Sequence, residues 1–170
     1  LYLAGASAMG EHVVFTGRLE HEEIADLLPA CEALVVPSTF PEAYGMVGAE
    51  AACCGTLPIS ADHSGLAEVS RVLEASVAPE VARWLRFPLD DEAVPNLAAC
   101  LIGWLEAPTP LRERTRRALT RAAREHFSWD GVARTAIAAT SAAAALMNRI
   151  LARRPGRAVP VRLAGRAARR

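Results

Sequence analysis

Two patterns of apolar and polar positions alternate along the first half of the chain. Short runs of β-branched and other apolar residues, closed by Gly or Pro, are typical of buried strands. Between these runs, apolar residues recur at helical spacing, as Ile24, Leu27 and Leu28 do, which predicts helices. We expect strands over residues 12–17, 33–38 and 56–60, and helices over residues 20–31, 45–55 and 64–73.

This alternation of strand and helix predicts an α/β fold, with a parallel sheet flanked by helices. Parallel strands need helical connections, and those connections are right-handed. Ligands bind such sheets in the crevice outside the carboxyl ends of the strands. The loops that follow the expected strands are residues 17–21, 37–45 and 60–65. A binding site is therefore expected on these loops.

The pattern changes after residue 73. We expect one more strand, two helices and then a long Ala-rich helix with Ser128 as its N-cap, over residues 81–91, 92–107, 110–127 and 128–154 respectively. The last residues show no periodicity, which indicates disorder. The predicted division of the chain is an α/β domain over residues 1–127, a helix over 128–154 and a disordered Arg-rich tail over 155–170.

Length and composition predict one soluble globular domain. A chain of 170 residues buries one core but is too short for two full domains. No apolar run reaches the length of a membrane span, and the first residues lack a signal-peptide pattern. The four cysteines lack metal-ligand spacing, which favours reduced thiols in a cytoplasmic protein. The sequence opens on Leu1, so we expect a piece of a longer protein.

Charge is distributed unevenly. The chain contains no Lys, and eight of its 19 Arg residues lie in residues 149–170, which contain no acidic residue. Residues 1–148 carry 11 Arg against 19 acidic residues, a net charge of −8. This acidic body argues against a nucleic-acid-binding domain. For the tail, a solvated segment is the preferred interpretation, and a weak contact with an anionic membrane is the second.

Residues 40–55, "FPEAYGMVGAEAACCG", place two carboxylates around a predicted helix start. If the helix begins near Gly45, the first N–H groups of the helix have no partner and can bind an anion such as phosphate. Glu42 precedes the helix and Glu50 lies inside it, and carboxylates accept hydrogen bonds from hydroxyls. A phosphate flanked by two hydroxyl-bearing rings, as in a nucleotide sugar, fits this layout. The plain alternative is that both glutamates are solvated.

Residues 37–69 resemble the donor-binding region of retaining glycosyltransferases of the GT-B fold, family 4 type. The family motif is P-S, then E-x-(F/Y)-G, a second Glu, a helix ending in A-C-G, and G-G-(L/I)-x-E. The matching positions are Pro37-Ser38, Glu42 to Gly45, Glu50, Cys54-Gly55, Ser64-Gly65-Leu66 and Glu68. The resemblance extends over roughly residues 10–140 and implies a Rossmann-like sheet, the C-terminal half of a GT-B enzyme.

The resemblance implies a role for each matched residue. Glu50 would bind the ribose hydroxyls and Glu42 would bind the donor sugar at the catalytic centre. Backbone N–H groups would bind the sugar and diphosphate, and a further pair would pack around the base; these residues are Tyr44, Gly45, Met46 and Val47, and Gly17 and Arg18. No metal or other cofactor is expected. One departure is Ser64, where the family usually has Gly.

The implied function is transfer of a sugar, with retention, from a nucleotide diphosphate sugar to a hydroxyl acceptor. The family's acceptor domain and its basic phosphate-binding pair precede the residues present, so this chain alone is expected to be inactive. The long helix from Trp129 would return to that acceptor domain. One alternative is a non-catalytic sugar-nucleotide-binding remnant or interaction module. A nucleotide-sugar epimerase is a weaker alternative, because the Glu pair follows the transferase pattern.

Overall fold

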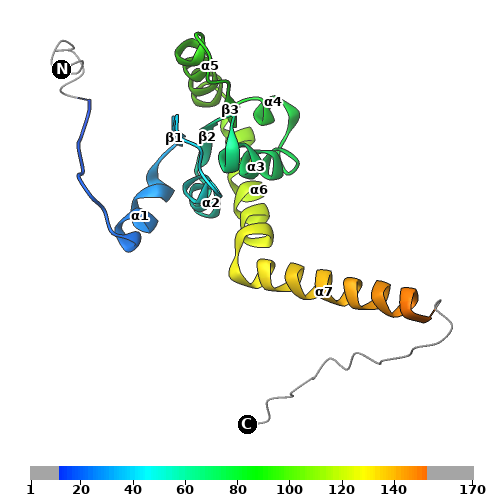
Figure 1. Ribbon diagram of the computed structural model, residues 1–170. Helices are drawn as coiled ribbons and strands as arrows, with labels where there is room; N and C mark the ends of the chain where they lie inside the picture. The colour runs from blue at the N-terminus through cyan, green and yellow to red at the C-terminus, as the bar shows by residue number, and fades with distance from the viewer. Residues whose placement is uncertain (1–11, 153–170) are drawn as a thin grey trace. The chain divides into compact units, whose positions relative to one another are not determined.

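Three parallel strands form the sheet, in the order β1-β2-β3. A computed structural model describes residues 12–152 (Figure 1). Its elements, in chain order, are α1 (His21–Leu27), η3 (Leu28–Ala30), β1 (Ala33–Val36), α2 (Met46–Cys53), β2 (Leu57–Ala61), α3 (Ser64–Glu74), α4 (Pro79–Ala82), β3 (Arg86–Phe87), α5 (Ala93–Leu105), α6 (Thr109–Phe127) and α7 (Trp129–Ala152). Residues 1–124 form one compact unit, which holds the sheet, and residues 125–170 form a second.

The strand β2 is the centre of the sheet, and all five of its residues are buried. Its register with β1 pairs Ala33 with Leu57, and its register with β3 pairs Ala61 with Phe87. The helices α2 and α3 pack against β2 and against each other, while α5 packs on β3 and β2. The Rossmann-like α/β fold expected from the sequence is therefore confirmed, and the carboxyl ends of β1 and β2 lie side by side.

Local sequence signals set the ends of the helices. Glu20 begins α1 through a capping box, in which the Glu20 N–H donates to the Glu23 carboxylate at 2.8 Å. Gly55 ends α2 in the left-handed conformation (φ 79°), and its N–H donates to the Ala52 carbonyl at 3.0 Å. In the second unit, the hydroxyl of Ser128 accepts a hydrogen bond from the Gly131 N–H at 3.0 Å. Ser128 is therefore the N-cap of α7, as predicted.

Glu32, the residue before β1, forms hydrogen bonds and ion pairs with α5 and α6. Its backbone carbonyl accepts a hydrogen bond at 2.8 Å from the indole N–H of Trp104, a fully buried residue of α5. Its carboxylate pairs with Arg112 and Arg116 of α6, at 3.1 and 3.0 Å. These bonds join residues more than 70 positions apart in the chain. They hold α5 and the first part of α6 against the sheet.

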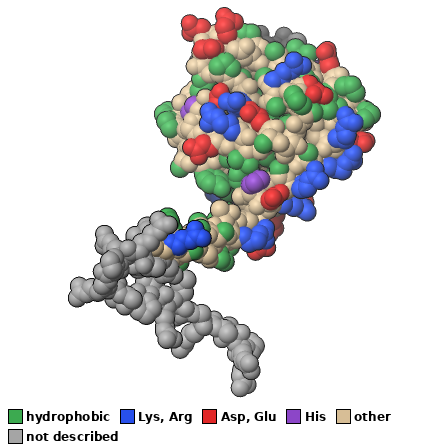
Figure 2. All heavy atoms as spheres, turned by 90° about the vertical axis from the view of Figure 1, so that its right-hand side faces the viewer, with side chains coloured by type: hydrophobic (Ala, Val, Ile, Leu, Met, Phe, Trp, Pro, Cys, Tyr) green, Lys and Arg blue, Asp and Glu red, His purple; other side chains and the backbone are tan. Residues whose placement is uncertain are grey.

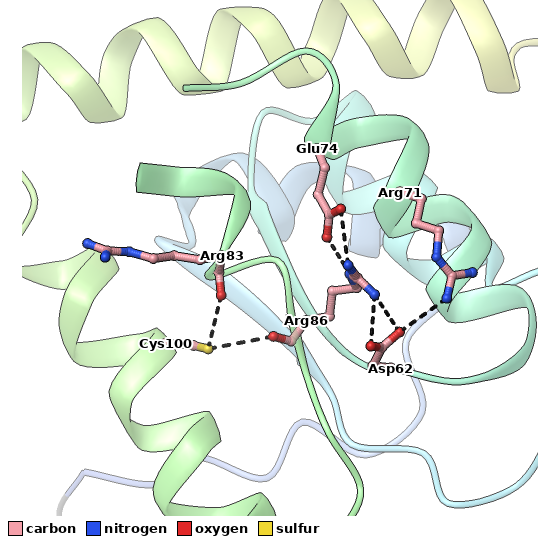
Figure 3. A network of polar contacts seen from close by, with 6 residues as sticks. All are labelled: Asp62, Arg71, Glu74, Arg83, Arg86 and Cys100. Atoms are coloured by element: carbon pink, nitrogen blue, oxygen red, sulfur yellow. Dashed lines mark hydrogen bonds and ion pairs between the residues drawn. The ribbon is translucent and has the colours of Figure 1, made fainter. Parts of the chain in front are cut away.

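A network of charged residues joins the ends of β2 and β3 to α3 (Figure 3). The Arg86 guanidinium lies between Glu74 and Asp62 and donates to both oxygens of Asp62, at 2.7 and 2.8 Å. Arg71 adds a longer contact to Asp62, at 3.6 Å. Hydrogen bonds to Glu74 and Asp62 raise the pKa of Arg86, so its charge is permanent. The network fixes the last turn of α3 relative to β3, and with it Asp62 in the loop that follows β2.

The prediction of a strand over residues 12–17 is wrong. The structure has no strand there, and Val14 and Phe15 are 85% and 78% exposed. An apolar β-branched run becomes a buried strand only when a neighbouring strand pairs with its backbone. Among residues 12–152, β1 pairs only with β2, and no strand pairs with this segment. The short helix α4 was not expected from the sequence.

The helix α7 carries several exposed large apolar side chains, which are those of Trp129, Val132, Ile137, Leu146 and Met147. Their exposure within the second unit agrees with the expectation that this helix presents an apolar surface. None of the helices in the described part of the chain combines the length and hydropathy needed to cross a bilayer. The predicted disordered tail, residues 155–170, lies outside the described residues.

Candidate functional site

Two loops meet at the carboxyl ends of β1 and β2. The Glu42 N–H donates to the hydroxyl of Ser64 at 3.0 Å, and the Gly65 N–H donates to the Glu42 carbonyl at 2.9 Å. Nearby, the ring Nε2 of His63 donates to the Ser38 carbonyl at 2.7 Å. Three hydrogen bonds thus join loop 37–45 to the start of α3, and we call this set of contacts the loop junction. It holds the backbone on both sides of Glu42 in one conformation.

Glycine is required on both sides of the loop junction. A Cβ on Gly65 would lie 2.5–2.7 Å from the backbone N, Cα and C atoms of Tyr44. Gly45 has a left-handed backbone (φ 71°), and its own Cβ would lie 2.9 Å from the Leu66 Cα. Only residues without a side chain allow this approach of backbone to backbone. The junction therefore brings the start of α3 directly against Tyr44 and the first residue before α2.

Ser64 takes the place of a glycine at this junction. Its φ is 49°, and it is the one residue other than glycine with a positive φ among residues 12–152. A left-handed conformation costs a non-glycine residue roughly 1–2 kcal/mol. The hydroxyl offsets this cost in part, because it accepts the hydrogen bond from Glu42. The departure from the family pattern at this position is thus accommodated by one side-chain hydrogen bond.

Two substitutions at Ser64 separate the cost of its backbone strain from the contribution of its hydrogen bond. Ser64→Gly loses the hydrogen bond, which contributes about 0.5–1.5 kcal/mol, but relieves the backbone strain. Ser64→Ala loses the hydrogen bond and keeps the strain. We expect the free energy of unfolding to be lower for Ser64→Ala than for Ser64→Gly by about 1 kcal/mol, measured by urea denaturation. Equal stabilities would show that Ser64 is not strained in solution.

The first turn of α2 opens onto this junction. Gly45 is the N-cap, and the N–H of Gly48 already donates to the Gly45 carbonyl at 3.1 Å. The N–H groups of Gly45, Met46 and Val47 donate no hydrogen bond within residues 12–152. Met46 and Val47 are 49% and 45% exposed. The first turn of α2 thus has three N–H groups without a partner among the described residues, at the positive end of the helix dipole, which is the arrangement that an anion site requires; Gly45 itself is buried.

Two half-buried carboxylates flank this helix end. Glu42 lies in the loop before α2, and Glu50 lies more than one turn inside the helix, as the sequence indicates. Neither carboxylate forms a hydrogen bond or an ion pair within the part of the chain that the structure describes. Burial raises the pKa of the Cys54 thiol, and the Glu50 charge raises it further. Both carboxylates are thus available to accept hydrogen bonds from a ligand.

Tyr44 contributes its backbone to the junction, and its side chain is 46% exposed. The binding of a sugar or diphosphate by its backbone N–H stays a prediction. Gly17 and Arg18 make their contacts elsewhere. Arg18 pairs with Glu20 at 3.2 Å in its own exposed segment, and a Cβ on Gly17 would meet no atom within 4 Å. Their role around the base stays a prediction.

The sequence did not predict the hydrogen bonds by which Ser38, His63 and Ser64 join loop 37–45 to the start of α3. The ring of His63 is held by its bond to the Ser38 carbonyl. The bonding partners lie 22 and 25 residues apart, so no local pattern links them. The one signal at Ser64 was its departure from the glycine of the family motif.

Fold and loop arrangement together define the class of protein. It is a Rossmann-like α/β domain in which α2 begins after β1, with Glu42 before the helix in the chain and Glu50 inside it. The chain belongs to the glycosyl transferases group 1 family, whose sequence model matches residues 2–125. This match confirms the resemblance that residues 37–69 indicate.

Named relatives belong to the same broad class. A glycogen synthase of Mycobacterium tuberculosis is 35% identical over 119 residues, which cover 70% of this chain and 26% of the relative. A D-inositol 3-phosphate glycosyltransferase of Rhodococcus erythropolis is 31% identical over 131 residues, which cover 77% of this chain and 27% of the relative. The chain therefore spans about a quarter of the length of these relatives.

Proposed function

We propose that this chain is the donor-binding part of a glycosyltransferase that uses a nucleotide diphosphate sugar. The observation that carries the proposal is the first turn of α2, whose N–H groups have no partner within residues 12–152. In the chain they lie between Glu42 and Glu50, whose carboxylates also have no partner in that part of the structure. The diphosphate would bind the N–H groups of Gly45, Met46 and Val47. Glu50 would accept hydrogen bonds from the ribose hydroxyls, and Glu42 from the hydroxyls of the sugar.

The loop junction supports this assignment physically. Catalysis by electrostatic stabilisation needs donors that are fixed before the reaction begins. The bonds from Glu42 and Gly65, with the close approach of Gly65 to Tyr44, fix the backbone from Glu42 to Gly45. In the proposed reaction, the bond between the sugar carbon and the diphosphate oxygen breaks, and negative charge develops on that oxygen. The helix N-terminus would stabilise this charge without a metal ion.

We further propose that transfer occurs with retention, to a hydroxyl acceptor held by another domain of a longer protein. The matched relatives are about four times as long as the aligned region, which leaves room in them for such a domain. The acceptor would lie across the carboxyl edge of the sheet, close to Glu42. On this proposal, residues 1–170 bind the donor but do not turn it over alone.

Titration calorimetry with UDP, GDP and ADP tests the proposal on the 170-residue chain. We expect saturable binding of at least one nucleotide diphosphate, with one site per chain. The corresponding sugar nucleotide should bind the same site and compete with it. If none of the three nucleotides binds while the chain unfolds cooperatively, the donor-binding assignment is wrong.

A further inference from the structure

A basic pocket lies at the opposite end of α2 from the proposed donor site. Its volume is about 520 Å³, and its lining residues are Cys54, Gly55, Arg116, Arg117, Thr120, Arg121 and Arg124. In Figure 2, basic side chains, all of them arginine in this chain, gather in a row along one edge of the molecule. A helix of eight residues is about 12 Å long, so the pocket and the N-terminus of α2 are separate places.

The pocket forms where α6 crosses the end of α2. Gly55 has φ 79°, and a Cβ on it would lie 3.3 Å from the Thr120 hydroxyl and 3.6 Å from the Arg116 Cβ. Thr120 donates its hydroxyl to the Arg116 carbonyl at 3.0 Å. The floor of the pocket is therefore close-packed backbone and short side chains. The other lining residues are four arginines of α6 and Cys54.

Three of these arginines share one face of α6. Residues 117, 121 and 124 are spaced i, i+4 and i+7, which places them over one another on a helix. Like charges at this spacing repel and lower helix stability. Acidic partners are scarce, because α6 holds six arginines and only two acidic residues, Glu113 and Glu125.

The arginines are not equally paired. Arg116 binds the Glu32 carboxylate at 3.0 Å and the Cys31 carbonyl at 3.2 Å, so its position is fixed. Arg117 has only a long contact of 3.9 Å with Glu113, and both side chains are largely exposed. Arg121 and Arg124 form no hydrogen bond or ion pair within residues 12–152. Although residues 1–148 carry a net charge of −8, the guanidinium groups of Arg121 and Arg124 thus have no local carboxylate partner within residues 12–152.

We infer that this pocket binds a compact organic phosphomonoester. Guanidinium groups bind phosphate oxygens in bidentate pairs, and a dianionic phosphate would match the repelling charges of Arg117, Arg121 and Arg124. A volume of about 520 Å³ lies in the range of small-molecule sites. The arginine stems and Cys54 give the body of the ester an apolar surface. The site is independent of the donor site and does not depend on the proposed function.

Titration of the whole chain with glycerol 3-phosphate and with inorganic phosphate tests the site. We expect saturable binding of glycerol 3-phosphate, with one site per chain and weaker binding at high salt. Arg124→Gln and Arg121→Gln should each weaken binding about ten- to a hundred-fold, because each removes a charged hydrogen bond. Arg121→Lys should retain part of the affinity, since lysine keeps the charge but loses the planar fork.

Arg114→Gln is the matched control, because Arg114 is an exposed arginine of the same helix that does not line this pocket. It lines the neighbouring hollow of Ser76 and Leu111, to which Arg117 and Arg121 also contribute. The substitution removes the same charge and should change the affinity less than about threefold. The three substituted arginines are exposed, so thermal unfolding should show that the variants fold. Equal losses in Arg114→Gln and Arg124→Gln would indicate only a diffuse basic surface and overturn the inference. No binding of glycerol 3-phosphate, or binding unchanged in Arg124→Gln, would overturn it as well.

Discussion

Replacing Glu50 by alanine should weaken nucleotide diphosphate binding by about ten- to a hundred-fold. A hydrogen bond to a charged group contributes roughly 1.5–3 kcal/mol, and each 1.4 kcal/mol is a factor of about ten in affinity. The Glu50 carboxylate is half-buried in α2 and has no partner within the described residues. Its removal therefore costs the ligand contact without breaking an internal ion pair. Titration calorimetry with the nucleotide diphosphate that binds the unsubstituted chain measures the effect.

Glu42→Ala should behave differently, because the proposed partner of Glu42 is the sugar. Affinity for the free nucleotide diphosphate should stay nearly unchanged, while affinity for the sugar nucleotide falls. The backbone bonds of Glu42 to Ser64 and Gly65 do not involve its side chain, so the loop junction survives the substitution. Glu80→Ala, at an exposed position in α4, serves as the control for loss of one negative charge. Equal losses in Glu42→Ala and Glu50→Ala, or none in either, would contradict the separate roles.

Gly65→Ala should produce the largest loss of stability at the site. The new Cβ would lie 2.5–2.7 Å from three backbone atoms of Tyr44, which is closer than nonbonded atoms approach. A backbone cannot swing away as a flexible side chain does, so the start of α3 and loop 37–45 must separate. Overpacking of this kind costs about 1–3 kcal/mol and occasionally more. Urea denaturation followed by circular dichroism should place the loss at the upper end of that range.

Gly48→Ala is the matched control for this substitution. Gly48 lies inside α2, where its new Cβ would make only ordinary contacts of 3.6–3.8 Å with Ser60, Pro58 and Val69. Alanine is favoured over glycine inside a helix by roughly 0.5–1 kcal/mol, so this variant should be as stable as the original chain or more stable. Gly65→Ala should also weaken nucleotide binding, because loop 37–45 would lose its fixed conformation. A fully stable Gly65→Ala chain would show that the two loops do not meet as described.

Much of the fold follows from local sequence patterns. The apolar runs over residues 33–38 and 56–60 predict β1 and β2, and helical spacing predicts α2 and α3 between and after them. Such patterns work because strand and helix periodicities are properties of neighbouring residues. The same reasoning fails for residues 12–17, where the run of apolar residues is present but a pairing strand is not. A strand is stabilised by its neighbour, and the sequence of the strand alone does not contain that neighbour.

By itself, the sequence determined the parallel α/β architecture, the start of α2 at Gly45 and its end at Gly55, and the two glutamates that flank that start. These features depend on periodicity, on glycine's freedom to adopt positive φ, and on spacing within one short segment. Only the tertiary structure decided that Ser64 and Gly65 hold the loop of Glu42, and that arginines of α6 gather over the end of α2. The physical reason is distance along the chain. Close approach of backbones and clustering of charges depend on how the helical connections cross the sheet, and no local pattern of residues encodes that crossing.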